Sequence, residues 1–316
     1  MKAAVVEVLG QAPKYQEFAE PVAAENEVLI KVRAAGLHPI VKAIASGAHY
    51  SSTGQVPMVA GIDGVGTRPD GARIYFGSAR KPWGTMAERC AAPSSMCLPL
   101  PDGISDVEAA AIANPGMSAW LSLKQRAEVK AGETVLILGA TGVAGQLAIQ
   151  VSRYLGAKRV IAVGRNVDAI AKENVDAIVA LGQSEDAVRE AFIAEATSGI
   201  DVVIDYLWGR PTELLLEALA KTFKPSSTKS TRLVEVGESA GKTITLPGFV
   251  LRSVDLKLLG SGFGSVALDS ILTAIPSLFE MAAARKLTVD VEPVPLAEVE
   301  TAWTRVEKGR RIVFVA

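Results

Sequence analysis

The stretch of the chain best suited to bind a charged ligand is a glycine-rich turn. Ala140, Gly142 and Gly145 are spaced as in the phosphate-binding pattern G-x-G-x-x-G, and an additional Gly139 precedes them. A glycine at 142 allows the main chain to approach a pyrophosphate, and a glycine at 145 allows a helix to pack close to a strand. The chemistry expected here is the binding of phosphate groups by main-chain N–H groups. The residues predicted to contact the cofactor are Ala140, Thr141, Gly142, Val143 and Ala144.

A second residue suited to phosphate binding is Arg165, about 20 residues after the glycines. In NAD-binding chains an Asp or Glu at this distance bonds the ribose 2′-hydroxyl, whereas this chain reads Val163-Gly164-Arg165-Asn166. A guanidinium presents a planar set of donors that fits a phosphate. We therefore predict that Arg165, assisted by Asn166, binds the 2′-phosphate of NADP(H). A solvated arginine in a loop is the alternative.

Two apolar runs and a helical pattern must position these residues. Val135–Leu138 has the length and branching of a strand buried on both faces, and Val160–Val163 is a second such run. Between them, apolar residues recur at helical spacing up to Gly156, which can cap the helix. A strand, glycine-rich turn, helix and strand within about 30 residues form a dinucleotide-binding unit, whose helix N-terminus favours phosphate charge. An ordinary tight turn between a strand and a helix is the alternative for the glycines.

Length and composition exclude several classes of protein. The 316 residues suffice for two domains with sizeable cores, and a net charge of −1 without a basic block argues against a nucleic-acid-binding surface. No apolar run approaches about 18 residues, so no membrane span is expected. Met1–Val8 alternates like a strand and lacks the apolar core of a signal peptide. The only cysteines, Cys90 and Cys97, suit free thiols in a reducing cytoplasm.

The rest of the chain divides into a β-rich part and an alternating part. Short strand-like runs punctuated by glycine and proline fill the N-terminal third, and later strands alternate with helices. Such alternation implies a parallel sheet with helices on both faces. The strands expected first are Met1–Val8, Glu27–Ala34, Arg73–Phe76 and Met86–Cys90, followed by helices at Asp106–Ala113 and Ser118–Arg126. The alternating elements expected are strands at Asp176–Leu181, Asp201–Leu207, Arg232–Val236 and Leu256–Leu259, with helices at Glu185–Thr197 and Thr212–Thr222.

Loops that leave the carboxyl ends of parallel strands face the ligand crevice. Three loops qualify, at residues 207–209, 237–241 and 260–264. Small residues there let the main chain approach a nicotinamide carboxamide, and the contacts predicted are Gly237, Gly260, Ser261 and Gly262. Lys224–Thr231 enters a strand and is interpreted as a solvated loop at the far edge. The chain is expected to end with a helix at Ser270–Arg285, a strand at Val289–Val294, a helix at Leu296–Val306 and a strand at Ile312–Val315.

A series of short motifs resembles, in its order, that of the medium-chain dehydrogenases/reductases. The motifs are Gly36-Leu37-His38-Pro39, Gly61-Ile62-Asp63-Gly64-Val65-Gly66, Pro101-Asp102-Gly103, Asn114-Pro115-Gly116-Met117-Ser118-Ala119-Trp120 and Gly132-Glu133-Thr134-Val135. The resemblance covers essentially the whole chain and implies an α/β fold in two domains. A β-rich, GroES-like catalytic domain would comprise residues 1–117 and 266–316, and a doubly wound parallel-sheet Rossmann domain residues 118–265.

The resemblance also bears on zinc, which some members of this family need for catalysis. Those members supply three protein ligands, typically Cys, His and Cys, and the matching positions here are His38, Ile62 and Asn114. Ile62 cannot bind zinc and Asn114 is a poor ligand for it. The four closely spaced cysteines of the family's structural-zinc lobe are absent between Phe76 and Pro101. We therefore expect no catalytic zinc. The alternative is a metal site built from His38, His49, Asp63 and Cys90.

Without zinc, the resemblance implies the quinone oxidoreductase branch, whose members pass a hydride from NADPH to a quinone or an α,β-unsaturated carbonyl. The cofactor carries that chemistry, so the protein must supply position and a dry pocket. The alternatives are a 2-enal or 2-enone reductase and a non-catalytic NADPH-binding sensor protein. Zinc-dependent alcohol oxidation ranks below the two reductase functions. The partner expected is a small-molecule substrate, with neither nucleic acid nor membrane.

The catalytic candidates are His38, Lys42 and Tyr50, which lie close together in the sequence. Tyr50 is predicted to donate a hydrogen bond to a substrate carbonyl as charge develops there. A tyrosine packed at a loop edge is the alternative. Quinone reductases of the family often have Asn at the position of His38 and Asp a few residues later, where this chain has Val41 and Lys42, so their substrate-binding roles do not carry over.

The strand Leu256–Leu259 is expected at one edge of the parallel sheet. An unpaired apolar edge invites pairing with another chain, and members of the family commonly dimerise by joining their nucleotide-domain sheets at this edge. The prediction is therefore a two-fold homodimer with a continuous sheet across its interface.

Overall fold

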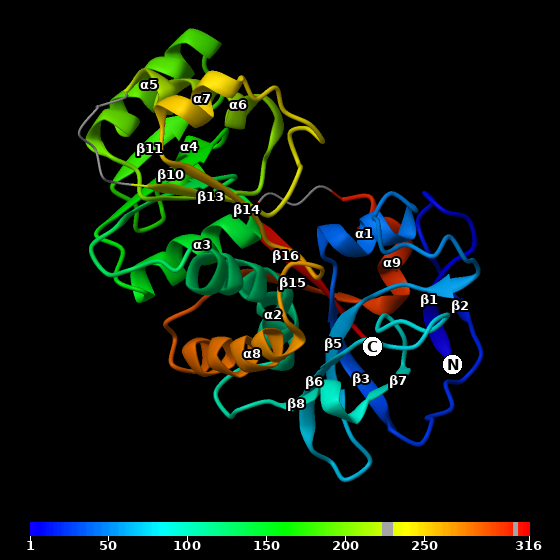
Figure 1. Ribbon diagram of the computed structural model, residues 1–316. Coiled ribbons are helices and arrows are strands. Elements are labelled where there is room, and N and C mark those ends of the chain that lie inside the picture. The colour runs from blue at the N-terminus through cyan, green and yellow to red at the C-terminus, as the bar shows by residue number, and fades with distance from the viewer. Residues whose placement is uncertain (223–229, 306–308) are drawn as a thin grey trace. The chain divides into compact units, whose positions relative to one another are not determined.

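The computed structural model describes residues 1–222, 230–305 and 309–316 (Figure 1). The chain divides into two compact units, of which one contains Met1–Pro115 and Leu272–Ala316 and the other Gly116–Ile271. The boundaries thus follow residues 115 and 271, where the sequence indicated 117 and 265. Most of the expected loop Lys224–Thr231, and the end of the helix expected at Leu296–Val306, lie outside the described residues.

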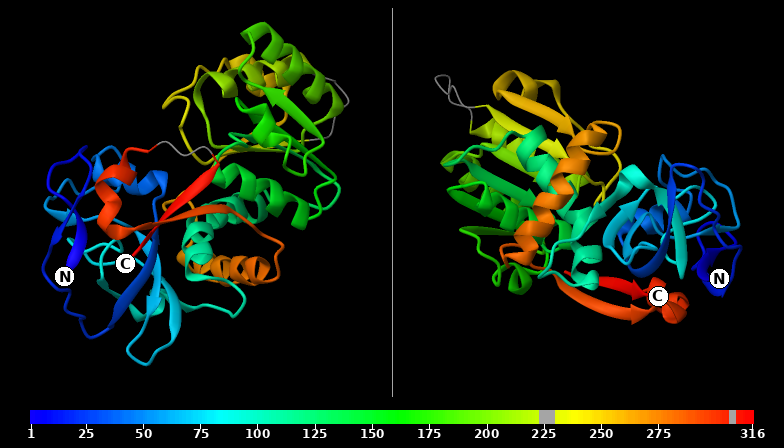
Figure 2. Two further views of the ribbon diagram at one scale, coloured as in Figure 1. Left: turned by 180° about the vertical axis from the view of Figure 1, so that it is seen from behind. Right: turned by 90° about the horizontal axis from the view of Figure 1, so that it is seen from below.

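The unit that holds both chain ends is built on two β-sheets. One has the strand order β2-β1-β4, and the other has seven strands in the order β15-β16-β3-β5-β6-β8, with β7 paired to β3. Because β16 pairs with β3 and β15 pairs with β16, the last strands of the chain complete a sheet begun near its start (Figure 2). The strands are β1 (Lys2–Val6), β2 (Lys14–Glu17), β3 (Glu27–Gly36), β4 (Met58–Val59), β5 (Asp63–Thr67), β6 (Arg73–Gly77), β7 (Arg89–Pro93), β8 (Cys97–Pro99), β15 (Asp290–Pro295) and β16 (Arg310–Val315), and the short helices are α1 (Pro39–Ala45) and α9 (Val299–Trp303).

The other unit is built on a parallel sheet of six strands in the order β11-β10-β9-β12-β13-β14. This is the doubly wound order, in which the strand order reverses between β9 and β12. Helices α5, α6 and α7 pack on one face of the sheet and α3 lies on the other (Figure 1), so the expected fold class is confirmed. The elements are β9 (Thr134–Leu138), α3 (Val143–Tyr154), β10 (Arg159–Gly164), α4 (Val167–Ile170), β11 (Ala177–Ala180), α5 (Glu185–Ser198), β12 (Val202–Asp205), α6 (Gly209–Lys221), β13 (Thr231–Glu235), α7 (Gly248–Ser253) and β14 (Leu256–Gly260).

Helices α2 and α8 each contain a proline in the helix interior. Helix α2 (Asp106–Trp120) continues through Pro115 and is followed by a π-helical turn, Leu121–Arg126, so the expectation of two separate helices was wrong. A proline inside a helix removes one main-chain hydrogen bond, but buried residues on both sides of Pro115 hold this helix together. Helix α8 (Leu268–Ala283) likewise contains a proline, Pro276.

Strand β12 ends at Asp205, two residues before the end expected from its apolar run. The carboxylate of Asp205 accepts the main-chain N–H groups of Leu207 and Trp208, each at 2.9 Å, and the hydroxyl of Thr212 at 2.5 Å. These bonds turn the chain out of the sheet, because they satisfy N–H groups that a longer strand would direct to its neighbours. Tyr206 therefore stands at the carboxyl end of β12 rather than inside the strand.

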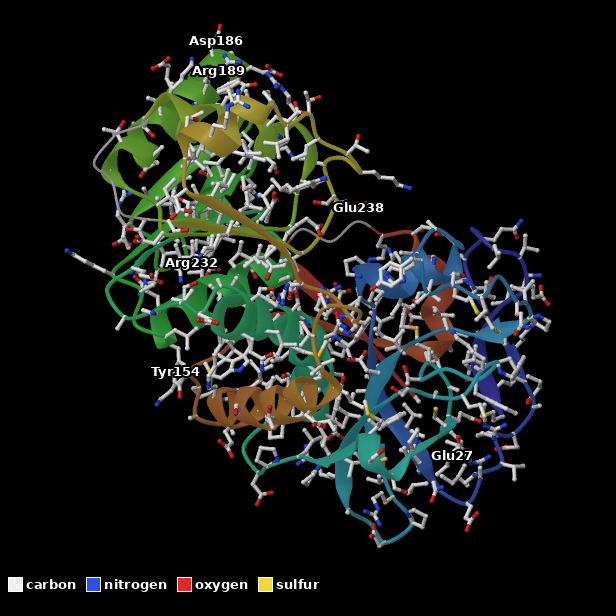
Figure 3. The ribbon with its side chains drawn as sticks, viewed as in Figure 1. Glu27, Tyr154, Asp186, Arg189, Arg232 and Glu238 are labelled. Atoms are coloured by element: carbon white, nitrogen blue, oxygen red, sulfur yellow. The ribbon has the colours of Figure 1, made fainter. Side chains whose placement is uncertain are left out.

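Ion pairs join α5 to α6 on the surface of the same unit. Arg189 donates to Asp186 at 2.6 Å and to Glu217, on α6, at 3.3 Å, and Figure 3 shows Arg189 and Asp186 beside each other on α5. Exposed pairs of this kind each contribute less than about 1 kcal/mol. The network helps to hold the two helices on the sheet, on the face opposite α3.

Candidate functional site

The glycine-rich turn follows β9 and is tied to the neighbouring strand β10. The N–H groups of Gly139 and Ala140 both donate to the carbonyl oxygen of Val163, each at 3.0 Å. Gly139 has a φ of +89°, a conformation that glycine adopts without steric cost. The turn is therefore held at the point where the carboxyl ends of β9 and β10 meet.

The two later glycines have different surroundings. A Cβ atom at residue 145 would lie 2.3 Å from the carbonyl oxygen of Gly139 and 2.7 Å from the Cα of Ala140, so α3 packs onto the turn only with glycine there. A Cβ atom at residue 142 would meet one atom, the Gly139 oxygen, at an ordinary 3.5 Å, and Gly142 is exposed. The protein itself thus requires glycine at 145, while glycine at 142 keeps the main chain open to a ligand.

The amino end of α3 supplies hydrogen-bond donors. The helix begins at Val143 with Gly142 as its N-cap, and no side chain caps it. The first N–H groups of a helix have no partner within it, and the helix dipole places positive charge there. Val143 and Ala144 thus lie at an uncapped helix end of the kind that binds phosphate, and their bonds to a phosphate stay predictions. Thr141 lies beside the end of β10, because a Cβ atom at Gly164 would come within 2.9 Å of its Cγ2 atom.

Arg165 and Asn166 follow directly from β10. Arg165 is exposed and makes no ion pair with any residue in the described ranges of the chain. The Oδ1 atom of Asn166 accepts the N–H of Ala169 at 3.2 Å and caps α4, which directs its amide NH2 group away from that bond. A guanidinium and an amide donor thus stand together at the carboxyl end of β10.

The loops after β13 and β14 form the other half of this edge of the sheet. Several of their polar main-chain atoms are already bonded: the carbonyl of Gly260 accepts Arg126 Nε at 2.7 Å, and the N–H of Ser261 donates to the Glu235 carbonyl at 2.8 Å. The N–H of Gly262 donates to Ser265 Oγ at 2.8 Å. These contacts fix the loop, and the direct cofactor contacts of Gly237, Gly260, Ser261 and Gly262 stay predictions.

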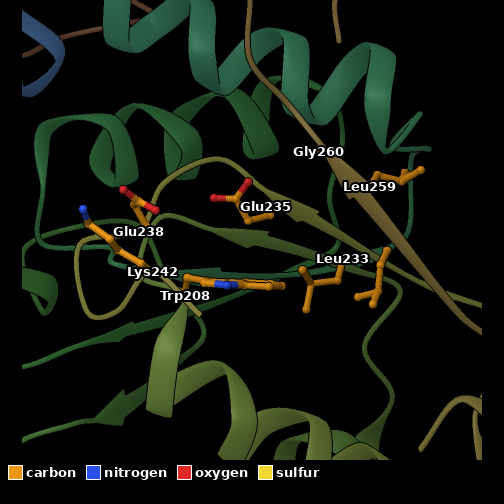
Figure 4. Close-up of a pocket in the computed structure, with 8 residues that line it drawn as sticks. Trp208, Leu233, Glu235, Glu238, Lys242, Leu259 and Gly260 are labelled. Carbon is orange, nitrogen blue, oxygen red and sulfur yellow. The ribbon is translucent and has the colours of Figure 1, made fainter. Parts of the chain in front are cut away.

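A groove of about 350 Å³ opens beside the same loops (Figure 4). Trp208 and three leucines supply its apolar lining, and two carboxylates stand at its rim; the lining residues are Trp208, Leu233, Glu235, Glu238, Lys242, Leu258, Leu259 and Gly260. Burial raises the pKa of Glu235, and the nearby Asp205 and Glu238 carboxylates act in the same direction. The groove thus extends from the edge strand β14 to the loops that follow β12 and β13.

His38 lies in the other unit, at the N-cap of α1, and is fully buried. Its Nε2 atom stands 3.4 Å from Asp63 Oδ1, while Asp63 Oδ2 accepts the hydroxyl of Tyr75 at 3.0 Å. Burial lowers the pKa of His38, and the Asp63 carboxylate opposes that shift. The structure therefore brings His38 together with Asp63 rather than with the other catalytic candidates.

Lys42 and Tyr50 have different environments from His38. Lys42 Nζ donates to the Arg305 carbonyl at 3.3 Å. Tyr50 is 76% exposed, with its ring centroid 4.1 Å from that of His49. The roles of these two residues and of His38 in catalysis stay predictions, and the exposed phenol of Tyr50 fits the alternative of a loop-edge tyrosine equally well.

The part of the chain that the structure describes contains no cluster of potential metal ligands. Among those residues, no three His, Cys, Asp or Glu side chains lie close enough to hold a metal ion. The alternative set therefore does not assemble: Cys90 is buried, and the Nδ1 atom of His49 lies 2.7 Å from Ser51 Oγ. In the described ranges, no helix has both the length and the apolar character needed to cross a membrane.

Sequence reasoning passed over one residue at this edge, Tyr206. It was assigned to the interior of a strand because the apolar run continues to Leu207. The available signal was Asp205, since an Asp at the end of an apolar run favours a turn.

Comparison with known proteins finds relatives that are named as quinone reductases or oxidoreductases. No protein-family model matches the chain. A protein of Emericella nidulans named "Probable NADPH-dependent quinone reductase" is 26% identical, over 96% of this chain and 96% of its own length. The human "Quinone oxidoreductase" is 30% identical over 65% of this chain and 61% of its own length.

Solved structures resemble the whole chain. The quinone oxidoreductase of Thermus thermophilus, whose structure was determined alone and with NADPH, is 29% identical with a TM-score of 0.80, and the match covers 100% of both chains. A mycobacterial quinone oxidoreductase has a TM-score of 0.84 at 22% identity, again over 100% of both chains, and shows likeness of fold alone.

Proposed function

Because the chain belongs to the quinone oxidoreductase-like branch of the medium-chain dehydrogenases/reductases, we propose that it reduces a quinone or related conjugated carbonyl with NADPH and without zinc. The relatives named for NADPH and quinones support this reaction. A substrate panel of quinones, 2-enones and 2-enals tests it, because the fastest NADPH oxidation identifies the substrate class. Binding of NADPH without turnover across the panel would instead favour a sensor protein.

The observation that carries the proposal is the arrangement around the turn after β9. The uncapped amino end of α3, the main chain at Gly142 and the exposed Arg165, which pairs with no residue that the structure describes, lie at adjacent strand ends. This arrangement fits a dinucleotide that carries an additional phosphate. Main-chain donors suit the pyrophosphate, and a guanidinium suits a dianionic 2′-phosphate. Gly164 replaces the carboxylate that would select a free 2′-hydroxyl.

NADPH supplies the hydride when it is bound, and the protein's own residues hold and orient it. In this proposal Ala140, Thr141, Gly142, Val143 and Ala144 bind the pyrophosphate, Arg165 and Asn166 bind the 2′-phosphate, and the loops after β13 and β14 face the nicotinamide half. Proton transfer is assigned to Tyr50, with His38, Lys42 and water as the other sources. The two free cysteines suit the cytoplasm, which we propose as its location.

Metal independence gives a direct prediction. Ile62 occupies a position that would need a ligand atom, so exhaustive chelation should leave NADPH oxidation unchanged. Elemental analysis of the purified protein should find zinc well below one atom per chain. Activity that is lost to a chelator and restored by zinc would contradict the proposal.

Dimerisation through β14 gives another prediction. The strand ends the sheet on one side, and Leu258 is 38% exposed. The Asp255 carbonyl and the Ser261 N–H group both form hydrogen bonds with β13. Because successive residues of a strand direct their N–H groups to opposite sides, the N–H group of Leu258 points to the open edge of the sheet. Leu258→Pro removes that N–H and spares the ladder to β13, so light scattering should show the monomer.

Two further measurements secure that result. An unchanged circular dichroism spectrum shows that the Leu258→Pro sheet has folded, and Leu258→Lys, which keeps the N–H but places charge on the edge, should weaken the dimer as well. A native chain that remains monomeric at high micromolar concentration would refute the proposed dimer.

A further inference from the structure

The loop after β14 begins with a peptide group that is held on both sides. The carbonyl of Gly260 and the N–H of Ser261 belong to this one peptide group. The N–H donates to the Glu235 carbonyl of β13 at 2.8 Å, and the carbonyl accepts Nε of the half-buried Arg126 at 2.7 Å. Figure 4 shows Glu235 and Gly260 on their neighbouring strands. Because the C=O and N–H of a trans peptide point in opposite directions, the two bonds together fix the orientation of its plane.

Packing contributes little to the orientation of this loop. A Cβ atom at Gly260 or at Gly264 would meet no atom of the described residues within 4 Å. Glycine also leaves the main-chain torsions without the restriction that a Cβ atom imposes. The next glycine is held by a hydrogen bond as well, since the N–H of Gly262 donates to Ser265 Oγ at 2.8 Å. The direction in which the chain leaves β14 therefore depends on hydrogen bonds, and Arg126 supplies one of them.

Arg126 is directed to this strand end by the π-helical turn Leu121–Arg126, of which it is the last residue. The N–H of Ala127 donates to the Ser122 carbonyl, five residues back, at 2.9 Å. A π-helical turn contains one residue more than an α-helical turn, so it gives the side chains that follow a different direction from that of an uninterrupted α-helix. Turns of this kind occur often at functional sites. Here the turn brings Arg126 to a carbonyl 134 residues later in the chain, within the same compact unit.

A second arginine, Arg232, holds the main chain that carries Arg126. Its guanidinium donates to the Ala127 carbonyl at 2.6 Å and pairs with Glu133, and Figure 3 labels it on β13. Arg232 lies near the amino end of β13, whereas Gly260 is the last residue of β14, at the carboxyl ends of the parallel strands. The two arginines therefore act at opposite ends of the strands. Arg232 supports the segment, and Arg126 reaches from it to the loop.

We infer that Arg126 is a positioning residue, which orders the loop at residues 260–264 for the nicotinamide half of NADPH by its bond to the Gly260 carbonyl. This inference rests on the proposed function, in which the loops after β13 and β14 face that half of the cofactor. With the guanidinium in place, the first peptide group of the loop has its orientation before NADPH binds. Without it, the freedom at Gly260 must be lost on binding, and that loss costs affinity.

Two ligands separate this role from a purely structural one. Adenosine 2′,5′-bisphosphate carries the 2′-phosphate but lacks the nicotinamide half, whereas NADPH has both. Arg126→Met keeps the apolar stem of the side chain and removes the guanidinium, so it should weaken NADPH binding by about 3- to 10-fold. Calorimetric titration should show an unchanged affinity for adenosine 2′,5′-bisphosphate. Arg126→Lys keeps a charged donor on a flexible stem and should restore part of the NADPH affinity.

Arg232→Met is the matched control, because it removes the other guanidinium that bonds to a main-chain carbonyl near this turn. It should lower the unfolding temperature and leave the ratio of the two affinities unchanged, since its bonds lie away from the loop. Equal losses of affinity for both ligands in Arg126→Met would assign Arg126 to structure alone. If Arg126→Met does not fold, Arg126→Lys carries the same comparison, with a smaller loss expected for NADPH and none for adenosine 2′,5′-bisphosphate.

The possible failures are distinguishable. If the native chain binds NADPH and Arg126→Met binds it equally well, the inference about Arg126 is wrong and the proposed function stands. If the native chain binds adenosine 2′,5′-bisphosphate as tightly as NADPH, the nicotinamide half makes no net contribution, and the inference is wrong as well. If the native chain binds neither ligand, the proposed function falls and the inference falls with it.

Discussion

Replacing Arg165 with alanine is expected to remove most of the preference of this protein for NADPH over NADH. A charge-assisted contact is worth about 1.5–3 kcal/mol, so the affinity for NADPH should fall roughly 10- to 150-fold. The affinity for NADH should hardly change, because NADH has no group for the guanidinium to bind. Arg165 is exposed and has no competing ion pair within residues 1–222, 230–305 and 309–316, which is the structural reason to expect the full effect. Titration of both cofactors by fluorescence or calorimetry measures it.

Two companion variants make the Arg165 result specific. Arg252→Ala removes another exposed arginine of the same unit, on α7, and should leave the ratio of the two affinities unchanged. Arg165→Lys keeps the charge but loses the planar pair of donors, so it should retain part of the preference. Equal affinities of the native chain for NADPH and NADH would remove the basis for assigning Arg165 to the 2′-phosphate.

Gly145→Ala is expected to destabilise the parallel-sheet unit itself. The added methyl group would lie 2.3 Å from the Gly139 oxygen, and main-chain atoms of the turn surround it, so no side chain can rotate to make room. Overpacking of this kind costs about 1–3 kcal/mol, and the rigid surroundings favour the upper end. For a unit of this size the unfolding temperature should fall by roughly 4–12 °C. Calorimetry without cofactor checks the result.

Gly142→Ala is the matched control, because the same methyl group meets no close contact there. Its unfolding free energy should stay within about 1 kcal/mol of the native value, since alanine is only a weaker N-cap than glycine. NADPH binding should nevertheless weaken by about tenfold or more, because the methyl group stands between the main chain and the phosphate. If Gly142→Ala binds NADPH normally, the pyrophosphate does not lie against this turn.

The parts of the fold predictable from sequence are those whose signals are local. The spacing of Gly139, Gly142 and Gly145 between two apolar runs is such a signal, because each glycine answers a requirement set within a few residues. The alternation of strands and helices likewise gave the parallel sheet. Short elements such as α1, α7 and β4 were missed, since their few residues carry too little periodicity.

The parts not predictable depend on contacts between distant segments. Helices were expected at Asp106–Ala113 and Ser118–Arg126, but α2 continues through Pro115, because burial on both sides of that proline overrides its local preference. His38 was chosen as a catalytic candidate for its residue type, whereas its full burial and its 3.4 Å approach to Asp63, on β5, arise only in the folded chain. Tyr206 carries no sequence signal of its own, because its enclosed hydroxyl is defined only by the folded sheet.

A single-turnover experiment tests the central claim most directly. The protein is mixed with one equivalent of NADPH without oxygen, a quinone is added, and NADPH oxidation and quinone reduction are followed together after chelation. The account predicts that one quinone is reduced for each NADPH oxidised, and that NADPH deuterated at the transferred position reacts more slowly. Bound NADPH that persists in the presence of quinones, 2-enones and 2-enals alike would contradict the proposed reductase.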